Sequence, residues 1–411
     1  MTVAQVVDRE SAAPSSRRSS SQQKGASILL ALMLLAFLQL KNPQNALEST
    51  RQLEYNENGS LPKEEVLVPV QIPLPTPPPG APDFSVPLEF ANCTERQLFN
   101  INLTLPNLFY TQCPVLPWVD HWIMTTEFRQ TFTSVFIGCN KGLSAIEAHH
   151  LGARQEEINR SAWANAYLNH AKIKQLRNRP SLEGYCQEMR RPSTPLVGNL
   201  TARPDTRTFC VEPLGLNAQL LRKSRDSLGL APTDFAVHRA VLWNVSGYNM
   251  SMPTYDKPGL ELKNIYDFTA TCRHQNCTES VPVVTLDQYV ADKAGKKGTI
   301  YFLSIKVEGY EVEILQGGAQ TLPRVQYLEF DYNKVGNWTS YNLNETIDEL
   351  EHEYGFICYF IGIQRAWRIN GCWRSMYEDH KRSSIGCVNN NHEEARPLLH
   401  VMEKVSAALI H

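Results

Sequence analysis

IYFLSIKVEGYEVEILQGGAQTL, residues Ile300–Leu322, combines an apolar strand, an acidic Glu-Gly turn and an amphipathic helix. The stretches Ser134–Gly142 (SVFIGCNKG) and Thr208–Pro213 (TFCVEP) have the same form of a strand that ends in a turn. Strands that alternate with helices predict a three-layer α/β sandwich around a mostly parallel sheet. In such sheets ligands bind beyond the carboxyl ends of the strands, so we expect the functional site at that edge.

The same patterns place further elements along residues 132–370, the expected core. Expected strands cover Phe132–Ile137, Thr208–Val211, Phe235–Trp243, Ile300–Val307 and Val325–Phe330, and expected helices cover Gly142–Leu151, Leu216–Ser227 and Glu311–Leu322. Phe356–Ile363 and Ala366–Ile369 are expected to form a terminal antiparallel strand pair. The stretch between the first two strands exceeds the roughly 30 residues of a plain βαβ step. Residues 152–206 are therefore predicted to form a large insertion after the first helix, as a helical excursion or lid.

The N-terminal part of the chain has the layout of a membrane-anchored enzyme. Residues 1–24 are polar and Ser-rich and are expected to be a disordered cytoplasmic tail. Ala26–Leu40 is uncharged and apolar, so residues 25–40 are interpreted as a signal anchor, with the core of a cleaved signal peptide as the alternative. Basic residues before this run favour a cytosolic N-terminus. Residues 41–90 then form a Pro-rich stem, and residues 91–411 form a lumenal domain.

Potential N-glycosylation sites favour the same orientation. The motif N-x-S/T begins at Asn58, Asn92, Asn102, Asn159, Asn199, Asn244, Asn249, Asn276, Asn337 and Asn344. This number exceeds the roughly three or four that chance would give, which indicates passage through the secretory pathway. We therefore predict a single-pass type II glycoprotein of the Golgi or another secretory-pathway membrane.

The chain has 10 cysteines, most of which are expected to form disulfides in an oxidising compartment. Cys139 and Cys210 are expected to be buried thiols in core strands. Cys272–Cys277 and Cys372–Cys387 are the local pairs that we predict, and the remaining connectivity is open. A single Cys-x4-Cys with one His is a poor zinc spacing, so no metal site is predicted. The formal net charge of −2 and the scattered basic residues argue against a nucleic-acid partner.

Two features carry the chemistry expected at the sheet edge. The turn Gly138-Cys139-Asn140-Lys141-Gly142 has glycines that allow tight bending and close backbone approach to a ligand. Glu212 ends the next strand, where a carboxylate can accept both ribose hydroxyls of a nucleotide-like cofactor. Together they indicate a nucleoside pocket.

In these motifs the chain resembles the FkbM family of S-adenosylmethionine-dependent methyltransferases. The family patterns V-D-I-G-C-N-K-G and L-S-I-D-V-E-G correspond to Val135–Gly142 and Leu303–Gly309. Phe209–Pro213 matches the second motif, and Val284–Asp287 matches the V-x-T-L-D element. Leu315-x-Gly317-Gly318-Ala319 and Leu328-Glu329-Phe330 also fit. The resemblance spans about residues 132–360.

The resemblance implies a Rossmann-like, seven-stranded class I methyltransferase sheet and O-methylation of a hydroxyl, often on a sugar or another small hydroxylated molecule. It implies that Gly138, Asn140 and Gly142 line the methionine and ribose side of S-adenosyl-L-methionine, and that Glu212 holds the ribose. Glu308 would lie at the reaction edge as the first candidate for a general base, with a neutral Lys306 or His238 as a further candidate. For His238, which ends a strand, a structural hydrogen bond is the favoured role. The acceptor is expected to be a glycan or glycoconjugate hydroxyl.

Two positions depart from the family pattern, because Phe136 and Lys306 stand where the family has Asp. An ammonium close to the cofactor's positive sulfonium would weaken binding unless Lys306 turns away, pairs with Glu308 or Glu329, or loses its proton. The alternative function is therefore a catalytically degenerate, methyltransferase-fold binding protein. A glycosyltransferase would share the anchored layout, but the chain has no D-x-D motif.

Overall fold

The computed structural model describes residues 84–105, 113–173, 188–198, 200–254, 258–259, 278–333, 335–379 and 382–408. All of them belong to one compact unit, Pro82–His411. The predicted tail, the apolar segment and most of the predicted stem lie outside the described residues. Within the described ranges, no helix is both long and apolar enough to cross a membrane.

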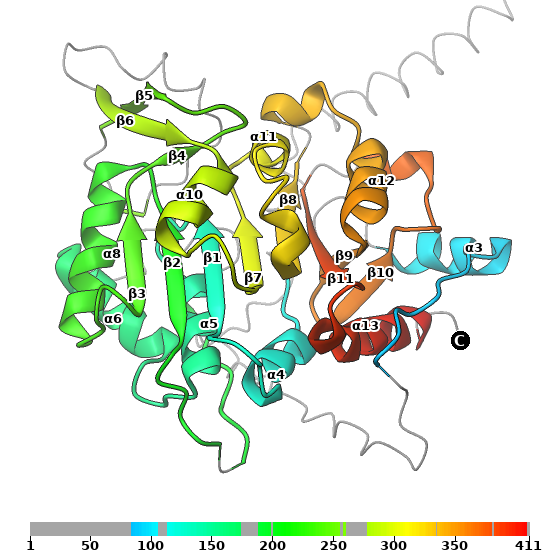
Figure 1. Ribbon diagram of the computed structural model, residues 1–411, viewed down its shortest axis with the longest axis horizontal. Helices are drawn as coiled ribbons and strands as arrows, with labels where there is room; N and C mark the ends of the chain where they lie inside the picture. The colour runs from blue at the N-terminus through cyan, green and yellow to red at the C-terminus, as the bar shows by residue number, and fades with distance from the viewer. Residues whose placement is uncertain are drawn as a thin grey trace, which may run out of the picture. The chain divides into compact units, whose positions relative to one another are not determined.

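A large mixed sheet forms the centre of the described fold (Figure 1). Its strand order is β10-β9-β11-β8-β7-β1-β2-β3. The strands β3, β2, β1, β7 and β8 pair in parallel, whereas β11 is antiparallel to β8 and β9, and β10 is antiparallel to β9. Their bounds are β1 Thr133–Ile137, β2 Arg207–Val211, β3 Phe235–His238, β7 Ile300–Ile305, β8 Val325–Tyr332, β9 Phe356–Gly362, β10 Arg365–Arg368 and β11 Ser383–Asn389.

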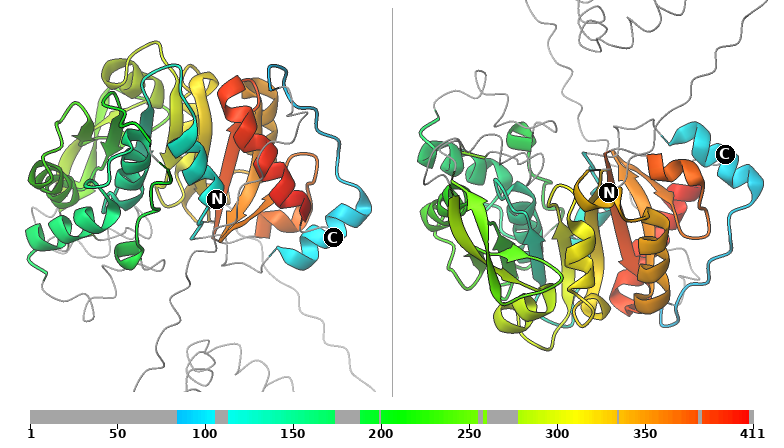
Figure 2. Two further views of the ribbon diagram at one scale, coloured as in Figure 1. Left: turned by 90° about the horizontal axis from the view of Figure 1, so that it is seen from below. Right: turned by 90° about the horizontal axis from the view of Figure 1, so that it is seen from above.

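Helices cover both faces of this sheet, as the side view in Figure 2 also shows. On one face, Phe136 and Phe302 share a core with the helices α4 Pro117–Thr125, α5 Leu143–Ala153, α6 Arg160–His170, α8 Gly215–Ser227 and α13 Arg396–Ala408. On the other, Val135 and Ile305 share a core with α3 Glu95–Thr104, α10 Leu286–Lys293, α11 Glu311–Gln316 and α12 Leu343–Tyr354. Short 3₁₀ helices cover Glu188–Arg190, Leu322–Arg324, Gly336–Thr339, Ser375–Asp379 and Glu393–Ala395. The predicted three-layer, Rossmann-like α/β class is thus confirmed, including the antiparallel pair β9–β10, but the main sheet of the described residues has eight strands rather than the implied seven.

A separate three-stranded sheet changes one strand prediction. Phe235–Trp243 was expected to be a single strand, but it divides into β3 and β4 Val241–Leu242. β4 leaves the main sheet and joins β6 Thr278–Val284 and β5 Tyr248–Pro253. The chain bends at Arg239, which pairs with Glu279 of β6. Both pieces are apolar, so the hydrophobic pattern alone could not separate them.

Two further elements differ from the expected bounds. Helix α11 ends at Gln316 rather than Leu322. Its C-cap residue Gly317 lies so close to the Trp243 carbonyl that a Cβ would be 2.5 Å from the oxygen, which explains the glycine at this position. Residues 152–206 do contain a helix, α6, which packs against α5 and α8. Residues 174–187 and 199 of the predicted insertion lie outside the described part.

The structure contradicts the expectation of free thiols at Cys139 and Cys210, because these two cysteines form a disulfide. Cys210 belongs to β2, and Cys139 directly follows Gly138 at the end of the neighbouring strand β1. The two Cα atoms are 5.6 Å apart, a usual separation for a disulfide. Adjacent parallel strands therefore bring together two thiols that the hydrophobic pattern placed separately in the core.

The predicted Cys372–Cys387 pair is also wrong. Cys372 bonds to Cys93, which lies 279 residues away in sequence. Cys387 bonds to Cys358, its direct cross-strand neighbour in the β9–β11 pair. Cys113 is disulfide-bonded as well. The predicted Cys272–Cys277 pair lies outside the described residues.

Candidate active site

The turn after β1 is fastened to the end of β2. The backbone N–H groups of Gly138 and Cys139 both donate to the Val211 carbonyl, each at 3.1 Å. Gly138, Asn140 and Gly142 have φ values of +80°, +48° and +75°. A left-handed backbone is unfavourable at a non-glycine residue such as Asn140 and commonly marks functional sites. The Asn140 Oδ1 atom is buried and has no hydrogen-bond partner, so it is an acceptor oriented within this turn that the protein leaves unused.

Gly138 also approaches the end of β7, on the other side of β1. A Cβ at Gly138 would lie 1.8 Å from the Lys306 carbonyl oxygen, and the Lys306 N–H donates to Ile137 at 2.9 Å. Only a residue without a side chain fits there. Gly142 has a packing reason of a different kind, because its Cβ would meet Leu221 and Trp163. The turn therefore lies between the carboxyl ends of β2 and β7.

Glu212 joins the turns that follow β1 and β2. Its Oε2 accepts the Asn140 N–H at 2.7 Å, and its Oε1 accepts the Leu214 N–H at 3.0 Å. The residue is 3% exposed, and burial raises the pKa of its carboxyl to about 7. A carboxylate has about four acceptor positions, and the Asn217 side chain also interacts with this carboxyl, so at most two positions remain for ribose hydroxyls. The Glu212 carboxylate and the unused Asn140 oxygen are hydrogen-bond acceptors, so they fit the ribose hydroxyls in the nucleoside part of S-adenosylmethionine.

The Glu-Gly turn after β7 is held by a residue that the sequence did not single out. Glu308 and Gly309 have φ values of +56° and +105°. Glu311, fully buried at the start of α11, accepts the N–H groups of Val307 at 3.0 Å and Gly309 at 3.1 Å. It also accepts the indole N–H of Trp338 at 2.8 Å. An acid in the first turn of a helix was the available signal, because anions are favoured there.

Lys306 forms an ion cluster with two carboxylates of β8. Its Nζ lies 2.7 Å from Glu329 Oε1 and 3.5 Å from Asp331 Oδ1. Asp331 in turn accepts a hydrogen bond from the Ser384 hydroxyl at 2.8 Å. All three charged side chains are partly exposed, and burial raises the pKa of Asp331 above its ordinary value. Of the alternatives that the sequence left open for Lys306, a pairing with Glu329 is present, and Asp331 is a second partner that sequence reasoning missed.

Phe136 is part of the core and packs edge-to-face on Phe302, with ring centroids 5.1 Å apart. It is 3% exposed. Its register neighbours are Cys210 in β2 and Ser304 in β7, and Ser304 is in turn opposite Glu329. Phe136 and Glu329 therefore belong to one row across the sheet. In this row the aromatic packing of Phe136 lies next to Glu329, which belongs to the ion cluster.

The small sheet borders the same edge from Glu212 to the Glu308 turn. Leu214, two residues after Glu212, packs with Val241 and Val283 of that sheet. At the other end, the Trp243 ring lies 5.2 Å from that of Tyr310, just after Gly309. In Figure 1 the small sheet lies beyond the arrowheads of β1, β2 and β3. It thus links two parts of the candidate site that are distant in sequence.

The structure brings most of the predicted site residues to one edge. Asn140 and Glu212 are in direct contact, Gly138 touches Lys306, and Glu308 lies in the turn that follows Lys306. Gly142 begins α5 at the far side of the same turn. Their roles in binding and catalysis remain predictions. Outside this set, His238 bonds to the Tyr289 hydroxyl at 2.7 Å, which is the structural hydrogen bond expected of a strand-end histidine.

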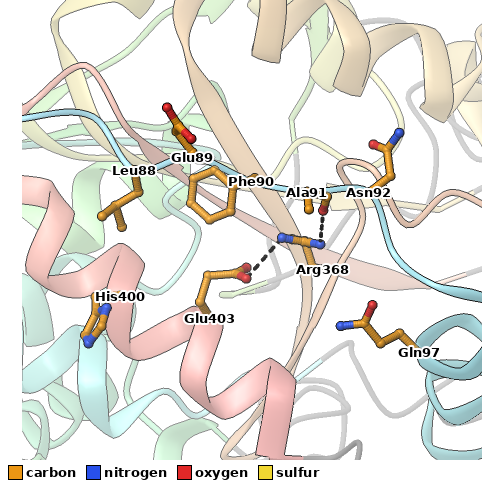
Figure 3. Close-up of a pocket in the computed structure, with 9 residues that line it drawn as sticks. All are labelled: Leu88, Glu89, Phe90, Ala91, Asn92, Gln97, Arg368, His400 and Glu403. Atoms are coloured by element: carbon orange, nitrogen blue, oxygen red, sulfur yellow. Dashed lines mark hydrogen bonds and ion pairs between the residues drawn. The ribbon is translucent and has the colours of Figure 1, made fainter.

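A cavity of about 390 Å³ lies at the opposite end of the sheet (Figure 3). Arg368 of β10 donates to the Ala91 carbonyl at 2.7 Å and pairs with Glu403 of α13 at 3.1 Å. The charge of Arg368 is therefore already balanced. Strands β8, β11 and β9 separate this cavity from the candidate site. Its lining is Leu88, Glu89, Phe90, Ala91, Asn92, Gln97, Arg368, His400 and Glu403.

Among the described residues, no group of three or more His, Cys, Asp or Glu side chains is placed to hold a metal ion.

The sheet and its carboxyl-edge turns define the class of a Rossmann-like methyltransferase fold. Residues 200–358, less than half of the chain, match the family model described as the methyltransferase FkbM domain. Over these residues the chain is therefore similar to a methyltransferase domain of FkbM type. The match includes Glu212, Lys306 and Glu308, but it begins after the turn at Gly138–Gly142. Comparisons with curated proteins and with solved structures found no match.

Proposed function

We propose that the chain is an S-adenosylmethionine-dependent O-methyltransferase that acts on a hydroxyl of a glycan or glycoconjugate in the secretory pathway. The observation that carries this proposal is the contact of the Asn140 amide with Glu212, beside the end of β7. Three strand ends thereby meet at the edge where α/β sheets bind nucleotide-like ligands. The FkbM match over residues 200–358 supports the same reaction class.

The residues of the turn after β1 and Glu212 would hold the cofactor. Glu212 would accept the ribose hydroxyls, and Gly138, Asn140 and Gly142 would lie along the methionine and ribose side. When bound, S-adenosylmethionine supplies an electrophilic methyl group for transfer to an oxygen. The remaining task of the protein is to orient the acceptor hydroxyl and to remove its proton.

The ion cluster and Glu308 are the groups available for that proton. An ammonium that is paired with carboxylates has no lone pair to accept a proton, so Lys306 orients Glu329 and Asp331 rather than acting as the base. Glu308 remains the first candidate base. Asp331 is a second candidate, because it is partly exposed and burial raises its pKa above the ordinary value of a carboxyl.

The proposed location is the lumen of the Golgi or of another secretory compartment, with residues 25–40 as a type II membrane anchor. The disulfides Cys93–Cys372, Cys139–Cys210 and Cys358–Cys387 support an oxidising compartment. Asn92, Asn244 and Asn249 begin exposed glycosylation motifs, which is compatible with N-glycans at these positions.

A second candidate function is a binding protein that no longer transfers methyl groups. The observation that favours it is the state of Glu212, whose two oxygens each accept a backbone N–H while the residue is almost fully buried. Phe136 also contributes only core packing at a position where the family has an acid.

Titration calorimetry of the full-length chain with S-adenosylmethionine separates these functions. We expect saturable binding that Glu212→Gln weakens, followed by transfer of a labelled methyl group to members of a glycan panel. No binding at millimolar cofactor would reject the methyltransferase and favour the binding protein. Binding without transfer to any glycan would reject the glycan acceptor alone.

A further inference from the structure

The Cys139–Cys210 disulfide lies inside the candidate cofactor site. Cys139 is the second residue of the turn after β1, directly before Asn140. Cys210 lies two residues before Glu212, at the end of β2. The disulfide therefore joins the two segments whose tips, Asn140 and Glu212, are hydrogen-bonded at 2.7 Å.

Besides this disulfide, the two segments are joined by hydrogen bonds and by the attraction between Lys141 and Glu212. Val211 accepts the N–H groups of Gly138 and Cys139, and Glu212 accepts that of Asn140. Each such bond contributes only about 0.5–1.5 kcal/mol net to stability. The left-handed backbone at Asn140 opposes them at a cost of about 1–3 kcal/mol. Because these two free energies are similar in size, hydrogen bonds alone would leave the turn in equilibrium between its ordered conformation and other conformations.

We propose that the Cys139–Cys210 disulfide positions the cofactor turn, so that the nucleoside site is complete only when this disulfide is oxidised. The inference rests on the proposed function, because it assumes that the cofactor binds at this turn. A dithiol reductant would transfer two electrons and two protons, break the S–S bond to give two thiols, and itself become a disulfide. The released turn would keep its competent form for only part of the time, and the apparent affinity would fall by that fraction.

The other described disulfides provide a matched control. Cys358–Cys387 joins neighbouring residues of β9 and β11, separated from β1 by β8 and β7. Removing it tests the general cost of losing a disulfide, which is about 2–4 kcal/mol. The Cys358→Ala/Cys387→Ala variant should therefore lose stability and keep its cofactor affinity.

The test compares full-length wild type, Cys139→Ser/Cys210→Ser and the control variant by calorimetry with S-adenosylmethionine. We expect about tenfold weaker binding by the Cys139→Ser/Cys210→Ser variant, and a change of less than twofold in the control. Hydrogen exchange provides a readout that needs no cofactor. Peptides that contain Asn140 should exchange faster in the Cys139→Ser/Cys210→Ser variant, whereas peptides from β7 should not change.

If that double variant fails to fold, wild type is treated with dithiothreitol under native conditions. Mass spectrometry of alkylated thiols then identifies samples in which Cys139 and Cys210 are reduced. Equal cofactor affinity and equal exchange at Asn140 in the oxidised and reduced forms would overturn the inference while the proposed function stands. No cofactor binding by oxidised wild type would overturn both.

Discussion

The two halves of the central sheet use polar residues in different ways. At the carboxyl ends of β1, β2 and β7, Asn140 and Glu308 have a left-handed backbone and Glu212 is a buried acid. At the other end, Arg368 is buried against Glu403 and the Ala91 carbonyl, and its role is to hold segments together. Left-handed Gln364 is there too, but it lies in the short turn between β9 and β10, where such a backbone is usual.

The left-handed backbone at Gln364 is explained by its short hairpin turn, whereas that at Asn140 and Glu308 has no such explanation. Asn140 and Glu308 both follow parallel strands, at the edge where ligands bind in α/β sheets. We infer that strands β3, β2, β1, β7 and β8 have been shaped for binding, and strands β11, β9 and β10 for stability. Four substitutions test this division, and they follow from the largest expected effect to the smallest.

Gly138→Ala should have the largest effect, because the new Cβ would lie 1.8 Å from the Lys306 carbonyl oxygen. We expect the free energy of unfolding to fall by about 3–5 kcal/mol in denaturant titrations. Gly229→Ala is the matched control, since its φ of +71° is similar but nothing lies within 4 Å of a Cβ there. The control should cost only about 1 kcal/mol. Equal losses in the two variants would show that close approach of β7 is not what requires glycine.

Arg368→Ala should destabilise the fold by about 2–3 kcal/mol, because it leaves the Glu403 carboxylate without its buried partner. Cofactor affinity should change by less than twofold. Thermal unfolding and calorimetry measure the two effects on the same samples. A loss of affinity larger than the loss for Glu212→Gln would break the proposed division of the sheet.

Glu212→Gln should weaken cofactor binding by about tenfold, since a neutral amide accepts ribose hydroxyls less strongly than a carboxylate. Burial raises the pKa of Glu212 to about 7, so wild-type affinity should fall as the pH is lowered from 8 to 6. The same raised pKa means that the contribution of Glu212 to folding stability is lost as the pH rises from about 4.5 to 7. Calorimetry across this pH range should give a flat profile for Glu212→Gln, and an unchanged slope would remove Glu212 from the site.

Lys306→Asp should have the smallest effect, a loss of about 1 kcal/mol in stability, because it places a third carboxylate beside Glu329 and Asp331. The uncharged control Lys306→Gln should lose less. Adding Glu329→Gln to Lys306→Asp should restore part of the loss, which a double-mutant cycle in thermal unfolding would detect. Higher stability of Lys306→Asp than of wild type would mean that the ion cluster is not a favourable interaction.

The sequence predicted the parts of the fold that are local. β1 with α5, β2 with α8, and β7 with α11 each follow from one continuous pattern of apolar residues and a turn. β11, Ser383–Asn389, was missed because SSIGCVN has no clear alternation and its place between β8 and β9 depends on distant strands. The disulfide partners were missed for the same reason, since Cys93 and Cys372 are 279 residues apart.

For the candidate site, motif positions predicted which residues gather at the edge but not how they are bonded. The contact of Asn140 with Glu212 depends on the pairing of β1 with β2. Asp331 could be assigned to the site only from the pairing of β8 with β7. In the sequence, its spacing from Glu329 is that of any two residues on one face of a strand.

The Cys93–Cys372 disulfide also has a mechanical consequence. Cys93 precedes every strand of the central sheet, and Cys372 follows β10. A pulling force applied between residues before Cys93 and residues after Cys372 would therefore pass through this disulfide, and the chain between the two cysteines would carry none of it. If the protein is tethered through its N-terminal end, β1, β2 and β7 are protected from being unravelled by tension on that tether.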